Sequence, residues 1–189
     1  RATAAPAREQ FVIHLGSQLK NTYNVELVSG DVLDVTQRSA AAAAARTARP
    51  TASLYSDSLR AMLLLVDPHV KFNSKQCQEF ERLCDASTEF HFESLQEQLK
   101  RVREDCAKNG ALSPGEFFIT RHSTLRDVQI VFHVVSDGGA AVTSGGAAGR
   151  VATLDAKAPL LQGLRNVLAL ASQYDVTALA LPVLLVERG

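Results

Sequence analysis

Tryptophan is absent from this sequence of 189 residues, methionine occurs once, and cysteine occurs three times. Cys77, Cys84 and Cys106 are odd in number and form no Cys-x-x-Cys pair, so neither a disulfide framework nor a structural zinc site is expected. Reduced thiols in a cytosolic compartment fit this pattern best. An excess of one charge is also missing, because 20 basic and 20 acidic residues cancel. The composition therefore gives no basis for a general nucleic-acid surface or an anionic-membrane surface.

Long hydrophobic runs are absent as well. The longest, residues 62–66, is far too short to span a bilayer. Since 46% of the residues are hydrophobic, the chain can nevertheless bury the core of one domain. We expect a disordered leader over residues 1–8, which loosely resembles a transit peptide, and a single domain over residues 9–189. Because the chain begins with Arg1 rather than Met, we expect it to be a fragment of a longer chain.

Two low-complexity segments interrupt the predicted domain. Residues 36–51 contain seven alanines and lack a face that a helix would bury, so we interpret them as a flexible insert. Residues 138–149 contain five glycines among alanine and serine. Because neither phosphate-binding glycine spacing is present in that segment, a second flexible insert is favoured over a phosphate-binding loop.

The clearest structural pattern lies in the C-terminal third. Residues 128–135 form an apolar run typical of a buried strand, and residues 158–174 carry apolar side chains at helical spacing. Residues 176–186 form a second buried run, which Pro182 interrupts. Two strands that are apolar on both faces and joined by a helix indicate a covered, parallel arrangement. The predicted fold class is therefore α/β, with a mixed, largely parallel sheet covered by helices.

The middle of the chain supplies further helices and strands. Residues 61–66 predict a buried strand that an Asp-Pro turn ends. Ser74 is predicted to cap the N-terminus of a helix that runs through Asp85. A second helix is predicted over about residues 93–108, where an Asn-Gly pair ends it, and a further strand begins at residues 116–120.

Residues 9–28 carry apolar side chains every four positions, which predicts an amphipathic helix and a helical N-terminal portion of the domain. The apolar stripe consists of Phe11, Leu15, Leu19, Tyr23 and Leu27. Its first four members are assigned to partner contact. The alternation of residues 25–28 is also compatible with a short strand.

A polar cluster follows the strand predicted at residues 116–120. Arg121, His122 and Ser123 place a cation, an imidazole and a hydroxyl where α/β proteins often carry sites. Neighbouring strand residues point to opposite faces, so His122 and Ser123 are poorly placed as a base and a nucleophile. A turn cluster or a partner contact is favoured over catalysis. We predict no catalytic residue, metal site or cofactor, and we interpret His133 as a core histidine.

Several segments resemble a known family in the same order and at similar spacing. They are FVIHLGSQLK at residues 11–20, LYSDSLRAMLLLVD at 54–67, ASTEFHF at 86–92, PGEFFITRHS at 114–123, GLRNVL at 163–168 and PVLLV at 182–186. Over almost its whole length the chain resembles the conserved domain of the fourth subunit of the FERRY complex. This resemblance implies a cytosolic, non-enzymatic subunit of a five-part effector complex of an early-endosomal Rab GTPase. It further implies contacts with the other subunits, indirect association with the GTPase and with mRNA, and a peripheral location on early endosomes.

A second likeness concerns the fold. Residues 115–135 followed by residues 160–182 resemble the latter half of a macro domain, which implies a nucleotide- or ADP-ribose-binding module. The ligand-binding residues that this alternative assigns are Arg121, His122, Ser123 and Asn166. The loop that cradles the phosphates in macro domains corresponds to residues 184–189, where bulky side chains and Glu187 oppose a pyrophosphate. A macro-like fold that has lost its ligand is favoured.

Two functional hypotheses remain. The favoured one is an interaction or scaffold subunit of a FERRY-like endosomal complex that links endosomes to mRNA transport. It predicts a large exposed apolar patch. The alternative is the ligand-binding module, which predicts a concave pocket at the strand ends, lined by backbone amides.

Overall fold

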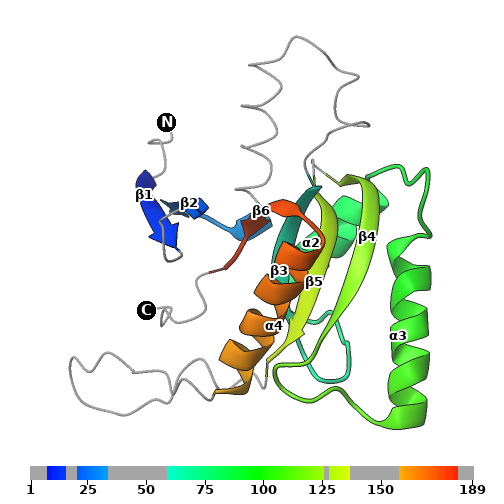
Figure 1. The fold of residues 1–189 in the computed structure, drawn as a ribbon. Helices are drawn as coiled ribbons and strands as arrows, with labels where there is room; N and C mark the ends of the chain where they lie inside the picture. The colour runs from blue at the N-terminus through cyan, green and yellow to red at the C-terminus, as the bar shows by residue number, and fades with distance from the viewer. Residues whose placement is uncertain (1–7, 16–20, 34–58, 126–127, 137–157, 183–189) are drawn as a thin grey trace, which may run out of the picture.

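The computed structural model describes residues 8–15, 21–33, 59–125, 128–136 and 158–182. These residues form a two-stranded sheet and a four-stranded sheet, and helices lie on both faces of the larger sheet (Figure 1). The predicted α/β class with a mixed sheet is confirmed. The two predicted inserts and, apart from Arg8, the predicted leader lie outside the described residues and stay predictions.

The four-stranded sheet has the order β4-β5-β3-β6. Its strands are β3 (Leu59–Val66), β4 (Phe117–Leu125), β5 (Val128–Val135) and β6 (Val176–Ala180). β3 is parallel to both β5 and β6, whereas β4 runs antiparallel to β5. The strand–helix–strand unit predicted for the C-terminal third is present as β5, α4 (Pro159–Gln173) and β6. Its two strands lie on either side of β3. The expectation that residues 176–186 are buried is wrong for β6, because β6 is an edge strand and all five of its residues are exposed or half-buried.

Helices α2 (Lys75–Asp85) and α3 (Leu95–Asn109) pack on one face of the sheet, and α4 packs on the other (Figure 1). The hydroxyl of Ser74 accepts a hydrogen bond of 3.1 Å from the backbone N–H three residues later, so the predicted N-cap is confirmed. A capping box formed by Ser94 and Glu97 begins α3. Both caps satisfy amide groups that the first turn of a helix leaves unpaired.

The sheet separates two apolar clusters because successive side chains of a strand point to opposite faces. From β3, Met62 and Leu64 join the cluster of α2 and α3, whereas Ala61 and Leu63 join the cluster of α4. Phe132 of β5 also belongs to the α4 cluster. Burial on both faces explains why these strands are continuous apolar runs in the sequence.

Two glycines bring the turn before β4 into direct backbone contact with α4. Gly115 has a φ of 86°, a conformation that favours glycine. A Cβ atom at Gly115 would overlap the backbone of Pro159, and a Cβ atom at Gly163 would overlap the carbonyl group of Gly115. This close approach fixes the start of α4 against the edge of the sheet.

The predicted N-terminal helix is wrong. The chain instead forms β1 (Arg8–Leu15) and β2 (Asn21–Val28), which pair antiparallel as a separate two-stranded sheet (Figure 1). We call this sheet the β1–β2 ribbon. Its valine, isoleucine, threonine and tyrosine residues suit a pleated strand better than a helix. Val32 and Leu33, shortly after the ribbon, are buried in the α2 and α3 cluster and tie it to the larger domain.

Candidate functional site

Arg121, His122 and Ser123 lie within β4 and not after a strand. The predicted strand end near residue 120 is wrong, because β4 continues to Leu125. Alternation along the strand turns His122 toward the face covered by α2 and α3, where it is 1% exposed, whereas Arg121 is exposed. The register between β4 and β5 shifts between Arg121 and Leu125, so this regular alternation does not extend through Ser123.

His122 belongs to a buried network of polar side chains that joins β4 to β5. Its Nε2 atom lies 2.9 Å from Oγ1 of Thr120, and the same oxygen lies 2.8 Å from Nε2 of His133. At the other end of the network, Nδ1 of His122 lies 3.2 Å from a carboxylate oxygen of Glu89. Thr120 and both histidines are at most 1% exposed.

The chemistry of these groups assigns a direction to the hydrogen bonds. An ionised Glu89 only accepts, so Nδ1 of His122 carries the hydrogen and donates it. Nε2 of a neutral His122 then accepts from the hydroxyl of Thr120, and that hydroxyl oxygen accepts from Nε2–H of His133. Nδ1 of His133 is left as an acceptor without a hydrogen-bond partner among the described residues.

The surroundings of His133 disfavour a positive charge. Its ring stacks on Phe118 with the ring centroids 4.5 Å apart, and Phe72 and Phe80 also contact it. Burial, reinforced by the neighbouring His122, lowers the pKa of His133 to about 3. Burial likewise lowers the pKa of His122, although Glu89 acts in the opposite direction. Both rings are therefore neutral at physiological pH.

The order Glu89, His122, Thr120 resembles the carboxylate–imidazole–hydroxyl order of a catalytic triad. Thr120 is 0% exposed, however, and its hydroxyl is already engaged by both histidines. The nearby Cys84 is also buried, and burial raises the pKa of its thiol to about 12. The network holds β4, β5 and the segment before α3 together, and it offers no accessible nucleophile.

The outer edge of β4 is closed by a side chain of α3. The amide nitrogen of Gln98 donates to the carbonyl oxygen of Arg121, and its amide oxygen accepts from the N–H of Arg121, both at 2.9 Å. The guanidinium of Arg121 lies 5.0 Å from the ring centroid of Phe92. Gln98 thus pairs with backbone groups that an adjacent strand would otherwise bind.

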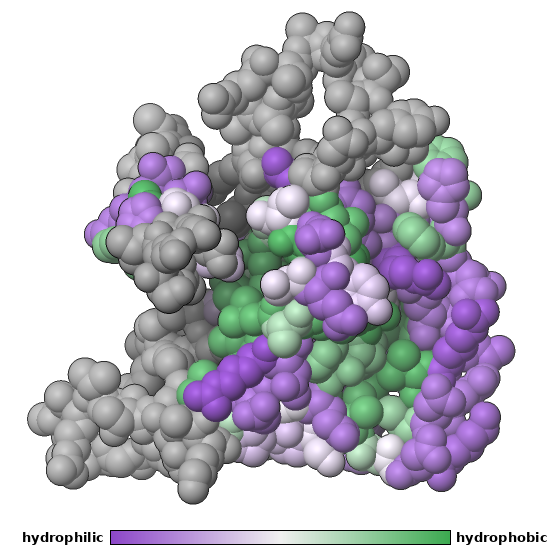
Figure 2. Space-filling model, viewed as in Figure 1, coloured by the Kyte–Doolittle hydropathy of each residue, from purple (hydrophilic) through white to green (hydrophobic). Residues whose placement is uncertain are grey.

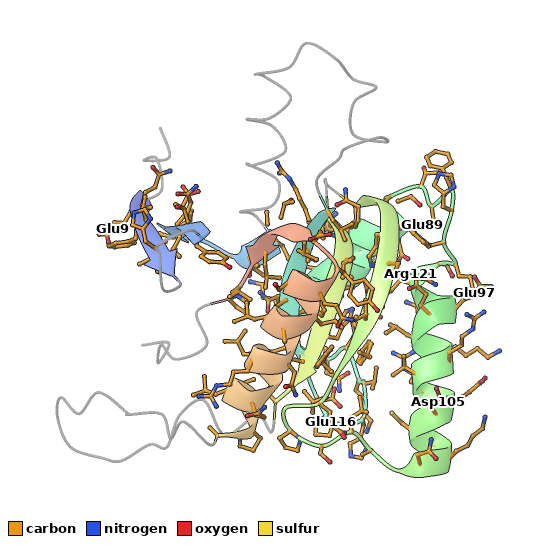
Figure 3. All side chains as sticks on the ribbon, in the orientation of Figure 1. Glu9, Glu89, Glu97, Asp105, Glu116 and Arg121 are labelled. Atoms are coloured by element: carbon orange, nitrogen blue, oxygen red, sulfur yellow. The ribbon has the colours of Figure 1, made fainter. Side chains whose placement is uncertain are left out.

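Ser123 fastens the segment before α3 to the same edge. Its N–H donates to a carboxylate oxygen of Glu89 at 2.7 Å, and its hydroxyl accepts from the backbone N–H groups of Phe90 and His91. Figure 3 shows Glu89 and Arg121 close together at this edge. Of the three residues of the polar cluster, Ser123 is the one whose side chain binds backbone groups.

The ligand-binding assignments stay a prediction. His122 and Ser123 are engaged in the internal contacts above, and Asn166 is an exposed residue of α4 whose side-chain oxygen accepts from Gln162 at 3.2 Å. A surface hollow of about 230 Å³ lies along α3 and is lined by charged side chains alone. Its lining consists of Glu93, Glu97, Lys100, Arg101 and Glu104. The residues assigned to ligand binding are not among them.

The β1–β2 ribbon has one apolar face. Antiparallel pairing sets Phe11 opposite Val25 and Ile13 opposite Tyr23, and alternation turns these side chains, with that of Leu27, to the same side. Each of the five is between 37% and 51% exposed. We call this set the apolar ribbon face. Single exposed apolar side chains are ordinary, whereas a contiguous set indicates a surface that another molecule or segment covers.

The opposite side of the ribbon is mainly polar. It carries Gln10, Val12, His14, Thr22, Asn24 and Glu26. Of the residues assigned to partner contact, Phe11 and Tyr23 lie on the apolar ribbon face. Leu15 ends β1, and Leu19 is outside the described residues. The assignment itself stays a prediction, but its apolar surface lies on strands and not on a helix.

A second apolar surface flanks α4. Figure 2 shows hydrophobic surface on both sides of this helix, over the larger sheet. Four strands span about 15 Å between the outermost two, and one helix is about 10 Å wide, so α4 alone leaves part of the face open. Ile119 of β4 is 37% exposed and Leu168 of α4 is 47% exposed as a result.

The described residues also limit other kinds of site. No helix among them is long and apolar enough to cross a membrane. Within the same ranges, no group of histidine, cysteine, aspartate and glutamate side chains is arranged to hold a metal ion. Cys77, Cys84 and Cys106 are free thiols.

Sequence reasoning missed Glu89 and Thr120. A signal for Thr120 was present, because residues two apart in a strand share a face, and Thr120 precedes the buried His122 by two positions. Glu89 comes from a segment without regular structure, and no local pattern connects it to a strand 33 residues away. The apolar ribbon face was missed because the residues were assigned to a helix.

Comparison with known proteins gives a consistent result. The family model described as Fy-3, Ferry endosomal RAB5 effector complex subunit 3, matches residues 2–111 and 103–188. The subunit 3 proteins of Rattus norvegicus, Mus musculus and Homo sapiens are each 32% identical over 214 residues, which cover 95% of this chain and 37% of the relative. This chain thus spans little more than a third of the length of the curated relatives it matches.

These matches test the family resemblance. The expected likeness to a FERRY complex subunit is confirmed, but the expected fourth subunit is wrong, because the matching family is that of the third. The macro-domain likeness is unsupported by these comparisons.

Proposed function

The chain belongs to the Fy-3 family, and from this membership we propose that it is a non-enzymatic interaction subunit of a FERRY-type RAB5 effector complex. Within the proposal, the protein is peripheral on early endosomes and contacts RAB5 and mRNA through its complex. The chain covers only 37% of the length of its relatives. The role that we propose for this region is therefore limited to a contact with another subunit. Residues 9–189 form one domain in this proposal.

The observation that carries the proposal is the apolar ribbon face. Its members include Phe11 and Tyr23, which are 47% and 51% exposed, and they lie side by side on a two-stranded sheet. A two-stranded sheet is marginally stable by itself in water, and covering one face with apolar side chains stabilises it. The ribbon therefore has the properties of a surface that is completed by another protein.

A catalytic role is less well supported. In the arrangement that resembles a triad, formed by Glu89, His122 and Thr120, the imidazole and the hydroxyl are enclosed in the core and the carboxylate is half-buried. Its hydroxyl satisfies two histidines and has no exposed surface. A network of this kind stabilises one packing arrangement, which suits a protein that presents surfaces to partners.

The test uses the full-length protein, expressed together with the other FERRY subunits. Beads carrying GTP-loaded RAB5 would capture the complex, and the amount of this subunit retained would be measured. Replacing Phe11 and Tyr23 by serine should reduce retention about tenfold, because aromatic side chains at the centre of an interface commonly contribute most of its binding energy. A matched control replaces Val12 and Asn24, on the opposite side of the ribbon, by serine. Equal retention of both variants and wild type would contradict the proposal.

A further inference from the structure

We propose that the apolar ribbon face is the docking site of a single amphipathic α-helix, laid lengthwise along the strands, with a basic residue at the end that meets Glu9. This inference rests on the proposed function and names the kind of partner segment that covers the ribbon.

The dimensions of the face match one helix. Each ribbon strand has eight residues, so the ribbon is about 27 Å long. Two strands about 4.8 Å apart, with their side chains, present a strip about 10 Å wide. An α-helix has a diameter of about 10–12 Å and reaches 27 Å in about 18 residues. One helix with apolar side chains at every third and fourth position therefore covers the strip from end to end.

Two other occupants fit less well. A strand added to the edge of β1 or β2 would satisfy backbone groups but leave Phe11, Ile13 and Tyr23 in water. A second copy packed face to face would bury the same small strip twice. The area of two such strips, each about 27 Å by 10 Å, is well below the roughly 1,200–2,000 Å² that a stable protein–protein interface buries. A helix that belongs to a larger subunit escapes this limit, because other surfaces of that subunit add to the contact.

The charge of the face gives the helix a direction. Glu9 pairs with Leu27 and therefore lies on the apolar side, at the end of the ribbon away from Ile13 and Tyr23. Figure 3 shows Glu9 at the opposite side of the molecule from Arg121, so the guanidinium of Arg121 is not its neighbour. A lysine or arginine at the matching end of the helix would pair with this carboxylate, and an acidic residue there would be disfavoured.

The test is photo-crosslinking within the assembled complex. A photoreactive benzoylphenylalanine replaces Tyr23 of the full-length protein, and a matched control replaces the neighbouring Asn24, which points to the other side. The complex is purified with all subunits, irradiated, and the crosslinked positions are mapped by mass spectrometry. We expect the Tyr23 probe to crosslink one partner segment at positions three and four residues apart, and the Asn24 probe to crosslink it at least about tenfold less, since the two side chains point in opposite directions.

Each other outcome contradicts the proposal that a helix docks on the apolar ribbon face. Crosslinks two residues apart would indicate a strand, crosslinks between two copies of this subunit would indicate a dimer, and crosslinks confined to the same chain would indicate an internal cover. Crosslinks from the Asn24 probe alone would place the contact on the wrong side of the ribbon, and no crosslink from either probe would mean that the ribbon is uncovered. In all these cases co-purification with the other subunits would leave the proposed function standing. Loss of the unsubstituted protein from the complex would instead refute the proposed function.

Discussion

Acid should destabilise this protein through His133, by an amount that the structure sets. The pKa of His133 is about 3 in the folded protein and 6.5 as an ordinary value, because burial among aromatic rings disfavours its charged form. Between these two values the unfolded chain binds more protons than the folded protein. The free energy of unfolding therefore keeps its full value, as far as His133 is concerned, above pH 6.5 and falls progressively as the pH is lowered toward 3. At pH 5 the loss attributable to His133 is about 2 kcal/mol.

Denaturant unfolding at pH 8 and pH 5 measures this loss. A His133→Phe variant keeps a ring to stack on Phe118 but has no proton to bind, so its stability should fall by about 2 kcal/mol less than that of wild type between the two pH values. His69 is exposed, and a His69→Gln variant serves as the control that should behave like wild type. Equal pH dependence in wild type and the His133 variant would refute the reasoning. If the variant fails to fold, NMR titration of the His133 ring in the wild-type protein tests the same lowered pKa. The ring should stay neutral down to about pH 4.

Three further predictions concern packing, capping and thiol reactivity. Gly163→Ala should lower the free energy of unfolding by about 2 kcal/mol, because the added Cβ overlaps the carbonyl of Gly115, and unchanged thermal stability would contradict the described contact. Ser94→Ala should cost about 1 kcal/mol in denaturant unfolding, because the capping box of α3 loses a partner, whereas Ser94→Asp should retain most of the stability. In the folded protein a thiol reagent should modify the half-buried Cys106 before Cys77 and Cys84, whose pKa values burial raises, and mass spectrometry showing equal rates would argue against that packing.

The α/β body was predictable because its local signals agree with its tertiary structure. Ser74 begins α2 and an Asn-Gly pair ends α3, as the capping rules require. The apolar run of residues 128–135 became β5 with the predicted bounds, since a strand covered on both faces needs apolar side chains throughout. Here each local preference and the packing of the sheet favour the same conformation.

The β1–β2 ribbon was mispredicted for a definite reason. Apolar residues at positions 11, 15, 19, 23 and 27 are spaced by four, and a spacing of four is also a multiple of the two-residue strand period. The stripe alone therefore did not distinguish a helix from strands. Ile13 and Val25 lie between its members and fit only the strand period, and both are β-branched.

The buried network was only partly predictable. His133 was correctly interpreted as a core histidine, because an apolar strand surrounds it in the sequence. Its connection through Thr120 to His122 depends on the register between β4 and β5, which pairs Phe118 with His133 and Thr120 with Val131. Strand register is set by tertiary packing, so a single sequence does not reveal it.

Hydrogen–deuterium exchange of the full-length protein, free and within the assembled complex, tests the central claim most directly. A ribbon with an uncovered apolar face opens readily, and a partner that covers it should slow exchange of the backbone amides of Arg8–Leu15 and Asn21–Val28. Slowing by about tenfold corresponds to about 1.4 kcal/mol of added stability, while the polar outer side of α3 should exchange equally in both states. Exchange of the ribbon at the same rate with and without its partners would contradict the claim that this surface joins the protein to its complex.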